Sequence, residues 1–206
     1  MRILLILLVT IPICSAEDFL PYAPIVSIRD GLSTKFVEYE STVFHKTKDY
    51  YYAVTTEEVD FSGGRKGIKL SHPDNIVFQA IIQVEHVASI PTAPIFFYRF
   101  PNLDWFDIQI DQIKEGIEYQ QSLKVKRWSY SGLDHISSLS VYSETYSEDG
   151  WKYTVIRGAI SKSWYGCPVY HKDKLYGVIC NNFYRNKKNY GTIIPMTKVF
   201  KYFNER

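Results

Sequence analysis

Cysteine is scarce in this sequence. Of the three cysteines, Cys14 lies in the N-terminal apolar segment, which leaves Cys167 and Cys180. Two cysteines are too few for a disulfide framework, although they can form one bridge in an oxidising compartment. They stand thirteen residues apart and the five histidines are scattered along the chain, so no zinc-ligand spacing results. We therefore expect no metal site and no cofactor.

The sequence also lacks an excess of charge, and it contains no internal repeat. Its 24 basic and 22 acidic residues leave a net charge of +2, and a balanced chain has no general affinity for nucleic acid. We therefore expect no nucleic-acid partner. The local basic cluster YRNKKNY, residues 184–190, is interpreted as a solvated hairpin tip. No Asn-x-Ser/Thr acceptor occurs, so N-glycosylation is not expected.

Only one long apolar run is present, and it begins the chain. The first 16 residues, MRILLILLVTIPICSA, place one arginine before this run and end in small residues, which is typical of a signal peptide. The run from Ile3 to Ile13 is too short to cross about 30 Å of hydrocarbon as a helix. We expect a mature chain that starts at Glu17 and is secreted to the extracellular space, with no membrane anchor after signal removal.

Aromatic residues are abundant, with 17 Tyr, 12 Phe and 4 Trp, and their side chains pack well on the pleated surface of a sheet. Short apolar segments bounded by turn residues recur along the chain. Alternation in SLKVKRW and WKYTVIRG indicates half-buried antiparallel strands. The predicted strands are 24–29, 41–46, 50–56, 75–85, 106–113, 122–130, 137–144, 151–158, 167–170, 174–181 and 190–195.

These segments predict an all-β fold. Eleven short strands with tight turns and no long amphipathic helix favour a barrel or a sandwich. The one predicted helix is the tail MTKVFKYFNER, in which Val199, Phe200 and Phe203 share a face. A break near Gly116 divides the chain into halves of similar size, which is compatible with two small barrels.

Several stretches resemble the chymotrypsin-like (trypsin-like) serine proteases. The family carries Gly-Asp-Ser-Gly-Gly-Pro near the C-terminus, followed by a hairpin and a Gly-Ile or Gly-Val strand. The matching residues here are SWYGCP, residues 163–168, followed by a charged turn and LYGVI. Gly166 and Pro168 match the motif in type, whereas Tyr165 stands where the nucleophilic serine is expected. Downstream, GTIIPMTKVFKYF is similar to the family's last strand and closing helix.

The family's histidine and aspartate have matching positions upstream. YYYAVTTEEVDF resembles the strand and turn of the Leu-Thr-Ala-Ala-His-Val pattern, which puts Glu58, or Glu57 with a one-residue slip, at the histidine position. DIQIDQIK is similar to the strand that the family's aspartate opens, which puts Asp107 at that position. The resemblance runs from about Thr42 to Phe203, and it preserves the order of the three positions.

The resemblance implies two six-stranded antiparallel Greek-key β-barrels, residues 17–115 and 116–206, with a short C-terminal helix. It also implies degenerate catalytic positions, because the triad needs an imidazole base, an aspartate and a serine. Tyr165 is a poor acyl acceptor without a strong base, and Glu58 beside Asp107 would supply two carboxylates instead of a neutral base. Ser163 replaces the glycine whose backbone freedom serves the oxyanion hole.

Two readings without catalysis are open. In the first, the protein is an inactive trypsin-like homologue, a pseudoprotease, that binds a protein or peptide partner with Ser163, Trp164, Tyr165 and Gly166. Aromatic side chains suit such a surface, because they give contact area at low entropic cost. In the second, the chain is a secreted all-β binding domain unrelated to proteases.

A catalytic alternative is also open. The chain could be an active cysteine endopeptidase of the chymotrypsin fold with Cys167 as nucleophile, since thiolates are intrinsically reactive. This alternative requires that Cys167 is not bridged to Cys180, and the sequence leaves such a bridge open. The candidate bases are His45, His72, His86, His135 and His171.

Overall fold

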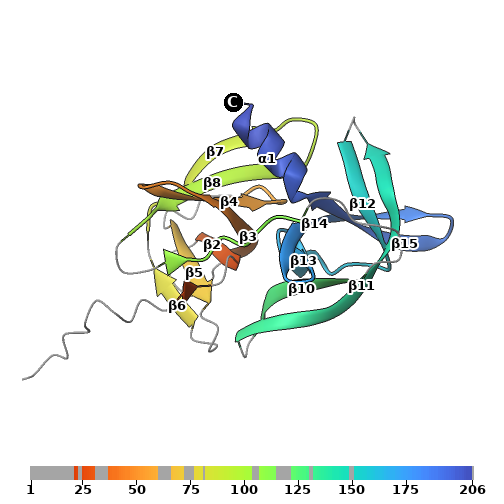
Figure 1. Ribbon diagram of the computed structural model, residues 1–206, viewed down its shortest axis with the longest axis horizontal. Coiled ribbons are helices and arrows are strands. Elements are labelled where there is room, and N and C mark those ends of the chain that lie inside the picture. Colours follow the sequence, from red (N-terminus) through yellow and green to blue (C-terminus); the bar gives the residue numbers. More distant parts are fainter. Residues whose placement is uncertain are drawn as a thin grey trace, which may run out of the picture.

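The computed structural model describes residues 21–22, 25–30, 37–59, 66–71, 77–80, 82–103, 107–114, 122–129, 132–148 and 151–205. Figure 1 shows two parts built of strands that lie side by side, with the C-terminal helix above them. The predicted signal peptide, residues 1–16, lies outside the described residues. Within the described ranges, no helix is both long and apolar enough to cross a membrane.

The N-terminal half is a seven-stranded antiparallel sheet. Its strands are β2 (Ile25–Asp30), β3 (Val37–Lys46), β4 (Tyr50–Thr55), β5 (Lys66–Ser71), β6 (Val77–Ala80), β7 (Glu85–Ile90) and β8 (Ile95–Pro101). They lie in the order β6-β5-β2-β3-β4-β8-β7. The two edge strands, β6 and β7, are consecutive in the chain, and their described residues do not pair with each other. A closed barrel in this half is therefore not confirmed.

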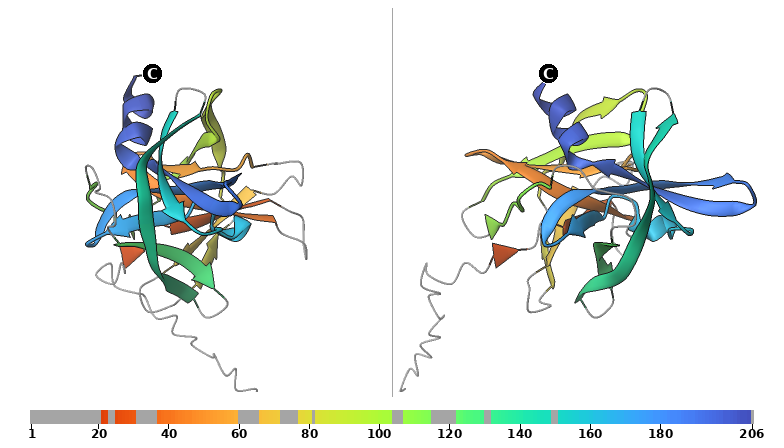
Figure 2. Two further views of the ribbon diagram at one scale, coloured as in Figure 1. Left: turned by 90° about the vertical axis from the view of Figure 1, so that its right-hand side faces the viewer. Right: turned by 45° about the vertical axis from the view of Figure 1, so that its right-hand side comes forward.

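The C-terminal half is a closed six-stranded barrel, as the resemblance implies. Its strands are β10 (Ser122–Ser129), β11 (Gly132–Glu148), β12 (Trp151–Arg157), β13 (Pro168–His171), β14 (Lys174–Arg185) and β15 (Lys188–Pro195). Their order is β10-β11-β12-β15-β14-β13, and pairing between β13 and β10 closes the barrel. Figure 2 shows β11 wrapping around the barrel and the β14–β15 hairpin extending beyond it.

The alternation of buried and exposed side chains that the sequence predicts is found in β10 but not in β12. In β10, Leu123 and Val125 are fully buried while Ser122 and Lys124 are exposed, as the sequence predicts. The antiparallel strand predicted at 151–158 is confirmed as β12, but residues 153–156 are all buried, so its predicted half-buried pattern is wrong. The reason is that β12 has two covered faces. One contributes to the barrel interior and the other to a core shared with the N-terminal sheet and the C-terminal helix.

The predicted C-terminal helix is confirmed as α1 (Met196–Asn204). Val199 is fully buried, and Phe200 and Phe203 pack against the shared core, so the predicted apolar face is the one that docks. Both rings meet Phe44 of β3 edge-on, with centroid distances of 5.3 and 5.1 Å. The helix therefore ties the end of the C-terminal half to the N-terminal sheet.

Among the seven strands of the N-terminal sheet, β5 and β8 were not predicted, and of β7 only Glu85 falls within a predicted segment, 75–85. The segment PIFFYRFP of β8 shows no alternation, because Ile95, Phe97, Tyr98 and Phe100 are buried on both faces of the strand. Pro94 and Pro101 bracket it, and proline argues against a central strand when it is read alone. In the structure, β8 nevertheless lies between β4 and β7.

The strand predicted at 106–113 is largely wrong. Only β9 (Asp107–Ile108) forms there, paired in parallel with β1 (Pro21–Tyr22). Further along, Ile113 makes a single bridge to Leu175, and Lys114 N donates to Leu175 O at 2.9 Å. The segment thus attaches to the surface of the C-terminal barrel instead of joining a sheet as a full strand.

Candidate functional site

The loop that matches the family's nucleophile motif is docked on the N-terminal sheet. A short 3₁₀ turn, η1 (Lys162–Trp164), leads into Gly166, whose φ is +83°. Gly166 N donates to Ile179 O at 2.9 Å, and Gly166 O accepts from Thr42 Oγ1 at 2.8 Å. A side chain on Gly166 would overlap the carbonyl oxygen of Glu40. Glycine is therefore required here by conformation and by space.

Tyr165, at the nucleophile position, is half-buried, and both its backbone N–H and its phenol oxygen make hydrogen bonds. Its backbone N–H donates to Lys162 O at 3.1 Å. Its phenol oxygen accepts a hydrogen bond from Asn182 Nδ2 at 3.2 Å, and its ring packs against the core of the C-terminal barrel. An oxyanion hole needs backbone donors aimed at the reacting oxygen. The N–H of Tyr165 is committed to a turn within the loop instead.

The structure brings Glu57, and not Glu58, to this loop. Strand β4 ends at Thr55, and the Glu57 carboxylate forms an ion pair with Lys162 Nζ at 3.1 Å. Glu58 is exposed, and the next residue, Val59, donates its N–H to Tyr98 Oη at 2.9 Å. Glu57, the alternative to Glu58 in the match to the family's histidine, is thus the residue that reaches the loop of the nucleophile position. It is a carboxylate paired with a lysine.

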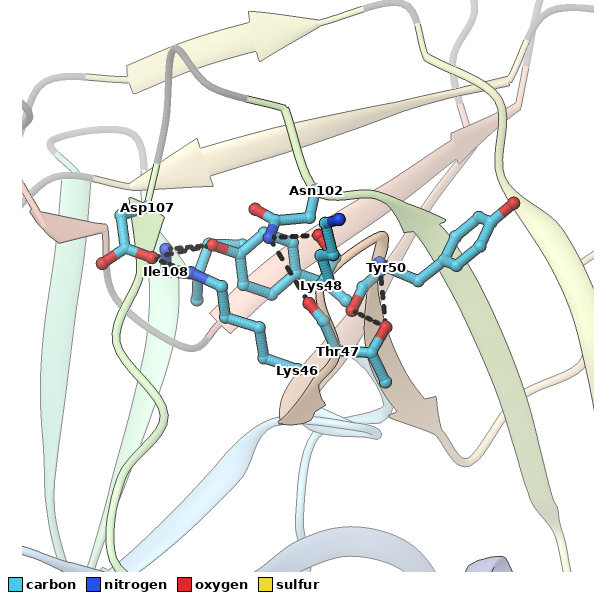
Figure 3. Close-up of polar contacts among 8 residues, drawn as sticks. Lys46, Thr47, Lys48, Tyr50, Asn102, Asp107 and Ile108 are labelled. Carbon is cyan, nitrogen blue, oxygen red and sulfur yellow. Dashed lines mark hydrogen bonds and ion pairs between the residues drawn. The ribbon is translucent and has the colours of Figure 1, made fainter.

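Asp107 belongs to a separate polar cluster, drawn in Figure 3. Its carboxylate accepts from Tyr51 Oη at 2.8 Å and from Lys46 Nζ at 2.5 Å. Tyr51 Oη in turn accepts from the N–H of Ile108 at 3.0 Å. This cluster fastens β9 to strands β3 and β4, so its role is to hold the connecting segment against the sheet.

Asp107 does not meet the other predicted catalytic positions. Its partner Tyr51 lies near the start of β4, whereas Glu58 follows the end of that strand at Thr55. Four residues of strand span about 13 Å at roughly 3.3 Å per residue. The constellation of Glu58, Asp107 and Tyr165 expected from the sequence is therefore not assembled.

We expect the substitution Asp107→Asn to lower the free energy of unfolding by at most about 1 kcal/mol at neutral pH, because both partners are substantially solvated. The side chains of Lys46 and Asp107 are 36% and 51% exposed. The hydrogen bond from Lys46 holds the pKa of Asp107 below its ordinary value. The stabilisation is then present above the carboxyl's unfolded pKa and is lost as pH falls through the folded one. Urea unfolding of both proteins should differ at neutral pH and converge in strong acid; a difference that persists in acid would contradict this account.

The two cysteines do not form a disulfide. Ile179 N donates to Cys167 O, which places Ile179 opposite Cys167 on the neighbouring strand and turns Cys180 to the other face. Accordingly, Cys167 lies in the barrel core and Cys180 in the core shared with the N-terminal sheet. Both side chains are buried, at 0% and 1% exposure. Cys167 is thus closed to a substrate in this structure.

A groove of about 490 Å³ lies between the two halves of the molecule. Its N-terminal wall is the end of β7 and the turn that follows it, residues 89–94, together with Phe96. The other wall consists of Tyr153 of β12 and Asn181 of β14. Among the described residues, no three His, Cys, Asp or Glu side chains form a group that could hold a metal ion. The groove offers polar and aromatic contacts, and none of its lining residues is a Lys, Arg, His, Asp or Glu.

No protein-family model matches the sequence, and no curated protein matches it. Solved structures do match. The MamO protease domain from Magnetospirillum magneticum superposes with a TM-score of 0.62 at 14% identity, over 91% of this chain and 98% of that chain. The HtrA-type protease AlgW, solved with a decapeptide, gives a TM-score of 0.64 at 11% identity, over 88% of this chain and 63% of its own. This chain has the fold of these protease domains, which is consistent with a chymotrypsin-like fold.

The segment that contains Asp107 is not the strand that neighbours the end of β4. The strand that runs beside the end of β4 is β8, since Thr55 pairs with Phe96. The resemblance places the aspartate at the opening of a strand, and β8 begins at Ile95, directly after Pro94. Sequence reasoning did not predict β8, and it matched the family's strand to DIQIDQIK. A sequence pattern does not show which strands pair, and the pairing of β4 with β8 became known only from the structure.

Proposed function

We propose that this protein is a secreted, catalytically inactive homologue of the trypsin-like serine proteases that acts by binding a protein or peptide segment. The observation that carries the proposal is the pair of hydrogen bonds that Tyr165 makes at the position of the nucleophile. Its N–H closes a turn with Lys162 and its phenol is held by Asn182, so neither is available to a scissile carbonyl. Secretion is proposed from the N-terminal segment, residues 1–16.

The neighbouring positions support the loss of catalysis. The histidine position holds Glu58, or Glu57 with the slip, and Glu57 is paired with Lys162. The aspartate position holds Pro94 or, in the reading from sequence, Asp107, which lies at the other end of β4. Removing triad members lowers turnover by about 10⁴ to 10⁶ in comparable enzymes. A chain that lacks both the nucleophilic serine and the histidine base should hydrolyse peptides no faster than the background.

The groove between the two halves supports binding as the retained activity. Ligand sites are commonly concave and placed between structural units, with apolar walls and a few polar groups that orient the ligand. Here Phe96 and Tyr153 supply aromatic surface and Asn181 supplies an amide. We propose further that the N-terminal sheet is the counterpart of the second Greek-key barrel, because its two edge strands belong to one stretch of chain.

The first test is hydrolysis of a diverse fluorogenic peptide library by the purified mature protein and by its Cys167→Ala and Tyr165→Ser variants. We expect no turnover above the buffer rate for any of the three. Turnover that disappears only in Cys167→Ala would establish a cysteine endopeptidase instead, and the proposal would be wrong. The burial of Cys167 argues against that result.

The second arm of the test measures binding. Peptides selected on the protein from a random display library should lose about tenfold or more affinity when Thr92→Arg places a long charged side chain at the rim of the groove. Val87→Arg is the matched control, because Val87 is exposed on β7 and does not line the groove. Equal affinity for both variants would place the peptide site elsewhere.

A further inference from the structure

A β-bulge interrupts the pairing of β14 with β15 at the wall of the groove between the two halves. The register of the two strands shifts between Ile179 and Asn182, so Cys180 and Asn181 both stand opposite a single residue of β15, Thr192. Bulges of this kind re-aim a side chain, and they are over-represented beside functional sites. Asn181 is one of the residues that line the groove, so the bulge presents its side chain there.

The buried hydroxyl of Thr192 fixes the orientation of the Asn181 side chain. Thr192 Oγ1 accepts from the N–H of Asn181 at 3.2 Å, and it donates to the main-chain oxygen of Asn181 at 3.1 Å and to the side-chain Oδ1. The carboxamide group is planar, with Oδ1 and Nδ2 on opposite sides of its carbon. Since Oδ1 is held by Thr192, the donor end of the amide is directed away from that residue.

The donor end of this amide is available to a ligand. Among the residues that the structure describes, none accepts a hydrogen bond from Asn181 Nδ2, whose nitrogen carries two N–H groups. Asn181 is half-buried, so a ligand that fills the groove would cover the amide completely. A donor that is covered without a partner costs free energy, and the ligand must therefore supply an acceptor at this point.

The opposite wall of the groove is an ordered turn. Ala93 N donates to Ile90 O at 3.2 Å and Ile95 N donates to Ala93 O at 2.7 Å, so hydrogen bonds within the turn hold its shape. Pro91 and Pro94 restrict the backbone further, because a proline ring fixes φ. The residues that line the groove include no charged side chain. A charged group of a ligand would therefore lose water here without gaining an ionic partner, and the groove favours uncharged ligands.

We propose that Asn181 determines which ligand this groove accepts: an uncharged peptide segment whose main-chain carbonyl oxygen accepts a hydrogen bond from Asn181 Nδ2. Apolar side chains beside that carbonyl pack against Phe96 on one wall and Tyr153 on the other. A carboxylate could also accept from Nδ2, but no cation lines the groove to compensate its charge. This inference rests on the proposed function, from which the peptide is taken as the class of ligand.

The first test changes the donor on the protein. Peptides selected on the full mature protein from a random display library are labelled with fluorescein, and their binding is followed by anisotropy. Asn181→Asp keeps an acceptor for Thr192 Oγ1 but replaces the donor Nδ2 by a second oxygen, so we expect it to weaken binding by about tenfold or more.

The matched control is Asn189→Asp, which makes the same chemical change outside the groove. Asn189 lies at the tip of the β14–β15 hairpin, where residues 184–189 are all exposed, in agreement with the solvated tip expected from the sequence. An added charge at such a site is screened by solvent, so this variant should bind within about twofold of the parent protein. Unchanged melting temperatures establish that both variants are folded.

The second test identifies the acceptor on the ligand. Each backbone carbonyl of the tightest peptide is replaced in turn by a thiocarbonyl, whose sulfur accepts hydrogen bonds more weakly than oxygen. One replacement should weaken binding to the parent protein by about fivefold or more. The same replacement should have no further effect on binding to Asn181→Ala, which is the result expected when the two changed groups interact directly.

Several results would overturn the inference. Equal weakening by Asn181→Asp and Asn189→Asp would show that only net charge matters. A thiocarbonyl scan with no position coupled to Asn181 would show that no peptide carbonyl binds Nδ2. A predominance of charged residues in the selected peptides would contradict the preference for uncharged ligands.

The variant Thr92→Arg separates this inference from the proposed function. If the peptides lose affinity for Thr92→Arg but bind Asn181→Asp as they bind the parent protein, the groove is the peptide site and Asn181 is not its donor. If no peptide is selected, or if the selected peptides bind Thr92→Arg and the parent protein equally, the groove is not a peptide site and both proposals for it are wrong.

Discussion

Replacing Gly166 by alanine is expected to destabilise the protein by about 2–5 kcal/mol. This figure is the sum of the cost of overpacking and the cost of holding a non-glycine residue in a left-handed conformation. The new methyl group would overlap Glu40 O and would lie 2.8 Å from the carbonyl carbon of Glu40 and 2.9 Å from Thr55 Oγ1. Two of these three atoms are backbone atoms in the middle of β3, so they cannot move aside as a flexible side chain would. The loop would have to leave the sheet.

Gly158→Ala is the matched control for Gly166→Ala. Gly158 also has a positive φ, +95°, but a methyl group there would meet nothing within 4 Å. It should cost only the conformational term, about 1–2 kcal/mol. Urea unfolding followed by tryptophan fluorescence measures both variants against the parent protein. Equal losses would show that the contact between Gly166 and β3 contributes nothing, and that the loop does not depend on its docking to the sheet.

Phe44→Ala should lower the free energy of unfolding by about 3–5 kcal/mol, the usual cost of truncating a buried phenylalanine. Phe44 is 1% exposed, and its ring contacts Phe97 of β8 in addition to Phe200 and Phe203 of α1. Its removal leaves a cavity at the point where the N-terminal sheet and the C-terminal helix meet. The control is Tyr184→Ala, because Tyr184 is 68% exposed and should cost less than about 0.5 kcal/mol.

The same variant should loosen α1. Limited digestion with trypsin reports this directly, since Lys198 and Lys201 lie within the helix and become cleavable only when it opens. Cleavage at these sites should be faster in Phe44→Ala than in Tyr184→Ala under native conditions. Equal cleavage rates would mean that the helix is held by the C-terminal barrel alone.

Much of the C-terminal half could be predicted from the sequence. Its strands alternate or are bounded by turn residues, and the tail helix carries its apolar residues on one face, so local patterns are sufficient. The loop at 163–168 was located by the same reasoning, because Gly166 and Pro168 keep the family's spacing. These features depend on neighbours in the chain, which a single sequence displays.

The candidate site was less accessible to sequence reasoning. Asp107 was assigned to the catalytic cluster because it opens an apolar stretch, yet its hydrogen bonds go to Lys46 and Tyr51. The strand that pairs with the end of β4 is β8. Sequence patterns did not reveal it because both of its faces are buried. The sequence left it undecided whether Cys167 and Cys180 form a disulfide, and the strand register decides this. Ile179 lies opposite Cys167, so Cys180, one residue further along, points to the other face.

By itself, the sequence determined that strands dominate, that one helix ends the chain, and that the three catalytic positions carry no serine and no histidine in their family order. Composition and local periodicity are sufficient for such statements. Only the tertiary structure decided which residues meet. It placed Glu57 beside Lys162, brought the phenol of Tyr165 to Asn182, and joined Gly166 to Thr42 of β3. Each of these contacts joins residues from different strands or loops, and the register that brings them together is set by the packing of the whole fold.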